Sequence, residues 1–130
     1  VTMAQLHHSR QNADYYGIIF RSDTDQSHYY LFEVITKANA EYVFSRFDNG
    51  LWHTIASGAA PSLKSGLGQN NTVTITANSN TFTFSINHKT IRDTVTDPMR
   101  SPLPAGLIGL YVEDQGAEIA FSHLYIVSHK

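Results

Sequence analysis

The chain has 130 residues, of which 42% are hydrophobic and 15% are charged; it has no cysteine, and its formal net charge is −2. This composition is typical of one folded globular domain and argues against disorder. The lack of cysteine excludes disulfides, thiolate metal sites and a cysteine nucleophile. The weak negative charge argues against nucleic-acid binding, and no apolar run is long enough for membrane insertion.

A hydrophobic period of two residues dominates the chain and predicts strands. The first, partial strand covers residues 1–6, and the start VTMAQLHHSR has no signal-peptide pattern. Further strands are expected at 15–21, 29–36, 41–47, 51–56, 72–77, 81–86, 90–95, 106–113 and 117–127. Turn signals at 48–50, 78–80 and 87–89 predict hairpins. About ten short strands without helical periodicity predict an all-β fold, an antiparallel β-sandwich or a barrel.

The segments 72–77 and 81–86 alternate between apolar and hydroxyl-bearing side chains. Their apolar side chains, from Val73 to Ile86, therefore share one face, and their threonines share the other. This pattern predicts a half-buried sheet whose hydroxyl face is in contact with solvent.

The segment YYGIIFRSDTDQSHYYLFEV, residues 15–34, predicts a strand pair that is apolar on both faces. If the loop 22–28 closes the pair, its core face holds three opposed pairs: Tyr16 and Val34, Ile18 and Phe32, Phe20 and Tyr30. We extend this register through a four-residue loop at 37–40 and a two-residue turn at 49–50. The extension places Trp52 in the core, beside Phe47 and Phe32.

The opposite face of this predicted sheet mixes charged and aromatic side chains around the gap left by Gly17. Aromatic rings stack on the apolar faces of sugars, and charged groups bind sugar hydroxyls. We therefore expect a ligand-binding patch with the following members: Arg21, Tyr29, Glu33, Tyr42, Arg46 and His53. The alternative is cross-strand ion pairing under a second apolar layer, and a one-residue slip in register would exchange the faces.

Several segments follow one another in the order found in a known superfamily: YYGIIFR, HYYLFEV, FDNGLW, SLKSGLGQNNTVTI, FTFSINHKTI, AGLIGLYVE and AEIAFSHLYIV. The chain resembles concanavalin A-like lectin and glucanase domains, particularly the laminin-G-like and 3-keto-disaccharide-hydrolase-like bacterial group. The resemblance implies a jelly roll of two curved sheets, with ligands on the concave sheet or its rim loops. It also implies further strands before the first, so residues 1–130 are expected to be one domain excised from a longer chain.

On this resemblance we expect a non-catalytic carbohydrate-binding module of a larger bacterial protein, with an extracellular location favoured and an oligo- or polysaccharide as partner. The alternatives are a glycoside-processing enzyme of the 3-keto-disaccharide type and a protein-interaction or sensor module of a surface protein. Self-association through an open edge at residues 1–6 is also expected.

Catalytic and metal-binding patterns are weak. Glucanases need closely spaced carboxylates, and no Glu-x-Asp-x-x-Glu run occurs; Glu113, Asp114 and Glu118 are interpreted as rim charges. The loop 23–27 offers alternate oxygen ligands that could hold calcium, although it lacks the pattern of an EF-hand. His7 and His8 have no third ligand placed near them. We therefore assign no catalytic residue and no metal site.

Overall fold

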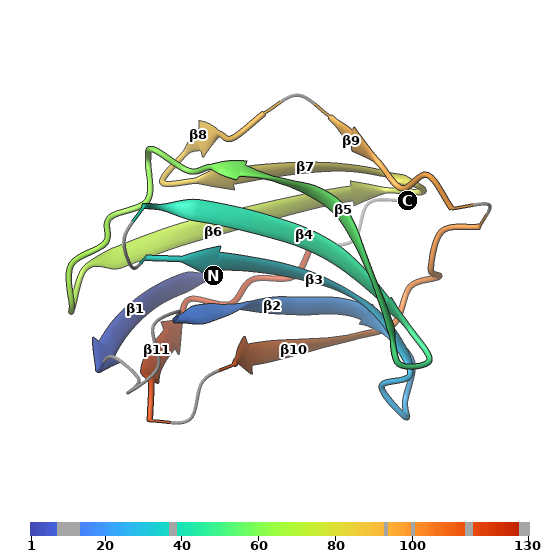
Figure 1. Cartoon of the computed structure of the whole chain (residues 1–130), viewed down its shortest axis with the longest axis horizontal. Helices are drawn as coiled ribbons and strands as arrows, with labels where there is room; N and C mark the ends of the chain where they lie inside the picture. Colours follow the sequence, from blue (N-terminus) through green and yellow to red (C-terminus); the bar gives the residue numbers. More distant parts are fainter. Residues whose placement is uncertain (8–13, 37–38, 93, 100, 114–115, 128–130) are drawn as a thin grey trace.

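The structure is a computed structural model, which describes residues 1–7, 14–36, 39–92, 94–99, 101–113 and 116–127. Across these residues every regular element is a strand, and the strands form two antiparallel sheets packed as a sandwich (Figure 1). The predicted all-β antiparallel sandwich is confirmed. Over the same ranges, no helix exists that could serve as a membrane span.

The first sheet has five strands in the order β10-β2-β3-β4-β5. Its members are β2 (Tyr15–Ser22), β3 (His28–Ile35), β4 (Glu41–Asp48), β5 (Leu51–Ala59) and β10 (Leu107–Val112). Strands β2 to β5 follow one another as hairpins, and β10 joins from the far end of the chain at the edge next to β2.

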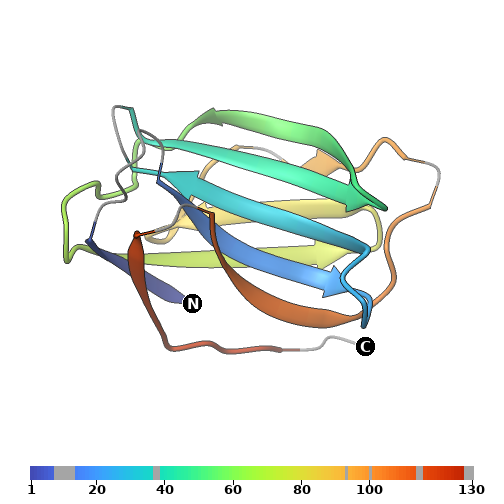
Figure 2. The ribbon, with the colours of Figure 1, turned by 60° about the horizontal axis from the view of Figure 1, so that its bottom comes forward.

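The second sheet has the order β11-β1-β6-β7-β8, with β9 also paired to β7 (Figure 2). Its members are β1 (Thr2–His7), β6 (Asn70–Asn78), β7 (Thr81–Ile86), β8 (Lys89–Thr90), β9 (Val95–Thr96) and β11 (Glu118–Ser122). The strand expected at 90–95 is thus two short strands. Strand β1 lies between β6 and β11, so the expected open edge at residues 1–6 is wrong. Self-association through an open sheet edge stays a prediction.

The core lies between the two sheets and is built mainly from aromatic rings. Phe32 stacks on Phe84 with ring centroids 4.5 Å apart, and Phe44 contacts the same ring at 4.7 Å. Tyr30 meets Phe82 at 4.9 Å. The side chains of β6 and β7 follow the predicted alternation, since Phe82 and Phe84 are buried whereas the threonines face outward. These contacts bury the inner faces of both sheets.

The register of the central sheet agrees with the prediction on one side of β3 and differs on the other. Tyr16 pairs with Val34, and Ile18 with Phe32, as expected. However, Ile35 pairs with Glu41, so five residues connect β3 to β4 in place of the expected four. Because side chains alternate between faces, this shift by one residue exchanges the two faces of β4.

The exchange moves some aromatic side chains into the core and others to the outer face. Tyr42 and Phe44 lie in the core, whereas Phe47 faces outward. The predicted pairing of Phe47 with Trp52 is confirmed, and Trp52 therefore also faces outward. Its side chain is 48% exposed, so the prediction that Trp52 lies in the core beside Phe32 is wrong.

Arg46 is also turned inward, where a buried polar network satisfies its guanidinium group. Its Nη1 donates to Asp97 Oδ2 at 2.7 Å and to the Ser101 carbonyl oxygen at 2.7 Å, while Nε donates to Asp48. The Tyr30 hydroxyl also donates to Asp97 Oδ2, at 2.6 Å. Burial alone would lower the pKa of Arg46, but the hydrogen bonds to Asp97 and Asp48 outweigh it and raise that pKa. This network holds the segment after β9 against the sandwich.

Candidate functional site

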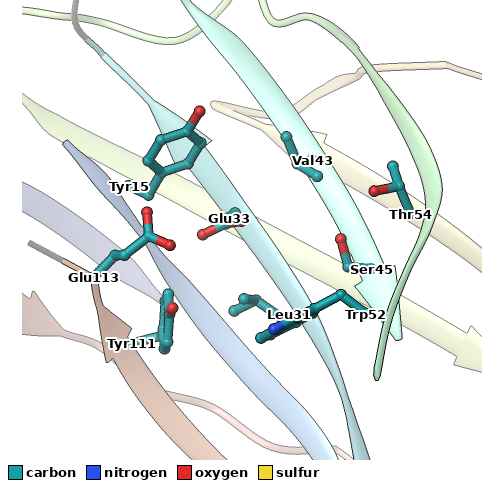
Figure 3. Close-up of a pocket in the computed structure, with 9 residues that line it drawn as sticks. All are labelled: Tyr15, Leu31, Glu33, Val43, Ser45, Trp52, Thr54, Tyr111 and Glu113. Atoms are coloured by element: carbon teal, nitrogen blue, oxygen red, sulfur yellow. The ribbon is translucent and has the colours of Figure 1, made fainter. Parts of the chain in front are cut away.

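A hollow of about 410 Å³ lies on the outer face of the five-stranded sheet, the face turned away from the core (Figure 3). All five strands of the sheet contribute to it, and Glu113, the residue that follows β10, contributes as well. Its lining residues are Tyr15, Leu31, Glu33, Val43, Ser45, Trp52, Thr54, Tyr111 and Glu113. We call this feature the outer hollow.

The pairing of the strands brings the lining side chains into rows. In one row Leu31 is paired with Ser45, and Ser45 with Thr54. In the next row Gly17 stands between Tyr111 on β10 and Glu33 on β3. Gly17 has no side chain, so no side chain stands between Tyr111 and Glu33 in this row.

Trp52 is held at the rim of the outer hollow by two other rings. Its ring centroid lies 4.8 Å from that of Phe47 and 5.8 Å from that of Tyr29, and those two rings are 5.0 Å apart. Trp52 is nevertheless about half exposed, so its indole combines a fixed position with a free surface. Fixed, half-exposed rings are suited to stacking against a flat apolar ligand surface.

Tyr111 and Glu113 form the opposite side of the outer hollow. The Glu113 backbone N–H donates to the Tyr15 carbonyl oxygen at 3.0 Å, which extends the pairing of β10 with β2 by one residue. Figure 3 shows the Glu113 side chain between the rings of Tyr15 and Tyr111. The Glu113 carboxylate lies close enough to the Tyr111 hydroxyl for its charge to raise the pKa of that phenol. One edge strand therefore supplies both a ring and a carboxylate.

Carboxylates and burial raise the pKa of two phenols at this site. Burial is the main cause that raises the pKa of Tyr111, the charges of Glu113 and Glu33 act in the same direction, and together these causes bring it to about 12. Burial and the charge of Glu33 likewise raise the pKa of Tyr29. Both phenols stay protonated at neutral pH, so they can donate hydrogen bonds. The site combines donor hydroxyls, two carboxylates and aromatic surfaces.

Only two of the six expected ligand-binding residues share the outer face. Glu33 lines the outer hollow, and Tyr29 supports Trp52 from below. Tyr42 and Arg46 lie on the inner face, 2% and 7% exposed. The prediction that all six form one patch is therefore wrong, for the reason of register given above.

Arg21 and His53 lie at other positions in the sheet. Arg21 has a φ of 51°, which breaks the alternation of β2, and its Nη1 donates to the Ser79 carbonyl oxygen at 2.6 Å. Its guanidinium also lies over the Phe82 ring, 5.5 Å from the centroid. His53 is paired with Arg46, and its Nε2 is 3.7 Å from Asp48 Oδ2. Neither residue lines the outer hollow.

The sequence interpretation missed Tyr15, Trp52, Tyr111 and Glu113 as members of the site. Trp52 could have been found from its correct pairing with Phe47, had β4 been placed on the right face. Tyr111 and Glu113 are two residues apart and so face the same way, but no sequence signal places their strand beside β2. Glu113, interpreted as a rim charge, lines the hollow; Asp114 is outside the described residues.

The loop proposed for calcium closes on itself through Asp23. The Asp23 carboxylate accepts hydrogen bonds from the backbone N–H groups of Ser27 and His28 at 2.9 and 3.0 Å. The bond from the His28 backbone is the main cause of the lowered pKa of Asp23. Over the described ranges no three His, Cys, Asp or Glu side chains are grouped as metal ligands. His8 lies outside these ranges, and calcium binding stays a prediction.

Comparison with known proteins gives a structural neighbour. No protein-family model matches the chain, and no curated protein matches it. Among solved structures, the carbohydrate-binding module CBM66 from Bacillus subtilis superposes with a TM-score of 0.63 at 19% sequence identity. The match covers 85% of this chain and 61% of that one, so this chain spans less than two thirds of its neighbour's length. At this identity the likeness establishes a shared β-sandwich fold.

Proposed function

We propose that the chain is a non-catalytic carbohydrate-binding module whose ligand occupies the outer hollow. One observation carries the proposal: the rings of Tyr15, Trp52 and Tyr111 and the carboxylates of Glu33 and Glu113 line one hollow of about 410 Å³. Small-molecule sites typically measure roughly 300–1,000 Å³. The fold it shares with a carbohydrate-binding module supports the same conclusion.

The chemistry of the lining matches that of a sugar. The C–H faces of a pyranose are apolar and stack on aromatic rings, which Trp52 and the two tyrosines supply. Sugar hydroxyls donate to carboxylates, and Glu33 and Glu113 are placed to accept those bonds. A protein-binding surface would instead favour a broad, flat apolar patch, which the two carboxylates interrupt.

Replacing Trp52 with alanine tests this assignment. We expect the affinity for the bound oligosaccharide to fall by at least about tenfold, because the half-exposed indole supplies the stacking surface. The melting temperature should change little, because Trp52 packs only at the rim. Isothermal titration calorimetry against a panel of neutral oligosaccharides, with thermal unfolding of each variant, measures both quantities.

The matched control is Leu51→Ala, which alters a neighbour on β5 that is 65% exposed and does not line the outer hollow. This variant should keep both affinity and stability. If Trp52→Ala binds as tightly as Leu51→Ala, the ligand does not use the outer hollow. Unfolding of Trp52→Ala would instead show that the indole is structural.

A second candidate is a glycoside-processing enzyme, which the presence of Glu33 and Glu113 in one hollow favours. Retaining and inverting hydrolysis both require a pair of carboxylates beside the scissile bond. Chromatography of the bound oligosaccharide after long incubation separates the two functions. A binding module leaves the sugar intact. Release of shorter sugars that stops in both Glu33→Gln and Glu113→Gln would establish the enzyme.

A further inference from the structure

Strand β10 is the outermost strand at one edge of the five-stranded sheet (Figure 2), and in the described part of the chain it pairs only with β2. Proteins commonly protect such edges with charged side chains or proline, because the unpaired backbone groups otherwise bind other strands. The sequence of β10, LIGLYV, contains no charged residue, histidine or proline. By contrast, β5 contains His53, β11 contains Glu118, and β8 and β9 have two residues each. Of the described edges, β10 is therefore the least protected.

The pairing of β10 with β2 determines which backbone groups point to the open side. The Glu113 backbone N–H donates to the Tyr15 carbonyl oxygen, and in an antiparallel pair every second residue directs both backbone groups to the same neighbour. By this alternation, the N–H and C=O groups of Ile108, Leu110 and Val112 point away from β2. They are directed to the side on which the structure describes no further strand of this sheet.

The side chains of the same three residues stand at the border of the core. Leu110 is paired with Ile18, and Val112 with Tyr16, so their side chains share the inner face with those two core residues. Nevertheless Ile108, Leu110 and Val112 are 39%, 47% and 40% exposed, because the sheet ends at β10. A further strand would satisfy the backbone groups and cover these side chains at the same time.

Exposed apolar side chains gather on this side of the molecule. Figure 2 shows that the segment after β11 runs along the same side of the sandwich as β10. Eight of the twelve exposed large hydrophobic side chains of the described residues belong to β10 or to this segment: Leu107, Ile108, Leu110, Val112, Leu124, Tyr125, Ile126 and Val127. Such a concentration is typical of a surface that binds another protein.

A second copy of β10 fits this edge under a twofold axis. Antiparallel pairing centred on Leu110 places this residue opposite its own counterpart, and Ile108 opposite Val112 of the partner subunit. The backbone groups that point away from β2 then bond to one another, and the apolar side chains cover one another on the inner face. On the outer face, Tyr111 lies opposite Gly109 of the partner subunit, where no side chain obstructs its ring.

The charges of the chain are compatible with this pairing. The register places the two Glu113 residues at opposite ends of the joined strands, each opposite Leu107 of the partner subunit, so like charges do not meet. The formal net charge of each chain is only −2, so repulsion between two copies is weak. A twofold contact also uses the same edge of both copies and therefore closes as a dimer.

We infer that two copies of the chain associate through β10 as a twofold dimer, in which their five-stranded sheets join into one continuous sheet. The axis is perpendicular to the joined strands and to the sheet, so both outer hollows lie on the same side. A polysaccharide with repeated sugars would then be bound at two sites, which raises its overall affinity. This last consequence rests on the proposed function, whereas the dimer does not.

Leu110→Cys tests the register directly, because the chain has no cysteine of its own. In the dimer the two introduced thiols stand opposite each other, with Cα atoms about 5.5 Å apart, a separation that a disulfide can span. Mild oxidation should therefore give a covalent dimer. The matched control is Leu51→Cys, which places an exposed thiol on β5 at the other edge of the same sheet. It should cross-link at least about tenfold more slowly, because its thiols meet only by random collision.

Sedimentation equilibrium measures the association itself. As the concentration is raised from about 1 to about 500 µM, the mean mass should rise from one chain toward two and no further. Leu110→Lys places like charges opposite each other at the axis and should weaken the dimer at least about tenfold, whereas Leu51→Lys should leave it unchanged. Val112→Pro removes an N–H that points away from β2, so it should weaken the dimer and keep the pairing with β2. Thermal unfolding shows whether each variant is folded.

Distinct results overturn the inference. A mass of one chain at every concentration would show that β10 does not bind a second copy. A mass above two chains, or cross-linking of Leu51→Cys as fast as that of Leu110→Cys, would show association through another surface. If Leu110→Lys fails to fold, Val112→Pro and the cross-linking decide the question. A monomer that binds sugar would leave the proposed function standing, and a dimer that binds no sugar would overturn the proposed function alone.

Discussion

Arg46→Ala should lower the free energy of unfolding by about 3–5 kcal/mol, the cost of breaking a buried ion pair by removing one partner. The Arg46 side chain is 9% exposed and that of Asp97 is fully buried, with Nη1 and Oδ2 2.7 Å apart. Without the guanidinium, the Asp97 carboxylate stays in the core with its charge uncompensated, and the Ser101 carbonyl oxygen loses a donor. Urea unfolding followed by circular dichroism measures the loss.

Arg92→Ala is the control for this prediction, because Arg92 is exposed and its removal should change stability by less than about 0.5 kcal/mol. Equal stability of the two variants would place Arg46 on a solvated face, as the sequence alone suggests. Arg46→Ala should also leave sugar affinity unchanged under conditions where the variant remains folded, because Arg46 does not line the outer hollow.

Gly17→Ala should destabilise the domain by about 3 kcal/mol or more, the upper range for overpacking. A Cβ atom at Gly17 would lie 1.9 Å from the Phe32 carbonyl oxygen and 2.7 Å from Glu33 Cα. Both atoms belong to the backbone of β3, so the two strands would have to separate to admit a methyl group. The loss of stability can be measured by thermal and urea unfolding.

Gly58→Ala provides the comparison within the same sheet. The atoms nearest to a Cβ there belong to the Tyr42 side chain, the first of them at 3.5 Å, which is an ordinary contact. Its effect should stay below about 1 kcal/mol. If Gly17→Ala is as stable as Gly58→Ala, strands β2 and β3 are not held as closely as the structure describes.

The fold class and one register could be predicted because their signals are local. In strands β6 and β7 apolar and hydroxyl-bearing residues alternate, so only one assignment of the two faces buries the apolar side chains. The loop between β2 and β3 fixes the pairing of Ile18 with Phe32. The connection between β3 and β4 has no such turn motif, and an error of one residue there placed Tyr42 outside and Trp52 inside. Because side chains alternate with a period of two, a shift by one residue moves every side chain of an affected strand to the opposite face.

The buried position of Arg46 and the distant members of the site could not be predicted, for different reasons. The register expected across the β3–β4 connection places Arg46 on the outer face, where a charged side chain is usual, so nothing in the pattern exposed the error. Its partner Asp97 follows β9 directly in a segment without regular pairing, whose position the sequence pattern does not specify. Tyr111 and Glu113 reach the outer hollow only because β10 pairs with β2, a long-range contact that no local motif indicates.

The emission of Trp52 during a sugar titration tests the central claim most directly. Trp52 is the chain's single tryptophan and lines the outer hollow, so its fluorescence reports on this site alone. We predict a saturable shift of the emission to shorter wavelength as the ligand covers the half-exposed indole, with the same dissociation constant as calorimetry. Binding detected by calorimetry without any change in Trp52 emission would contradict the account, because the sugar would then bind elsewhere on the molecule.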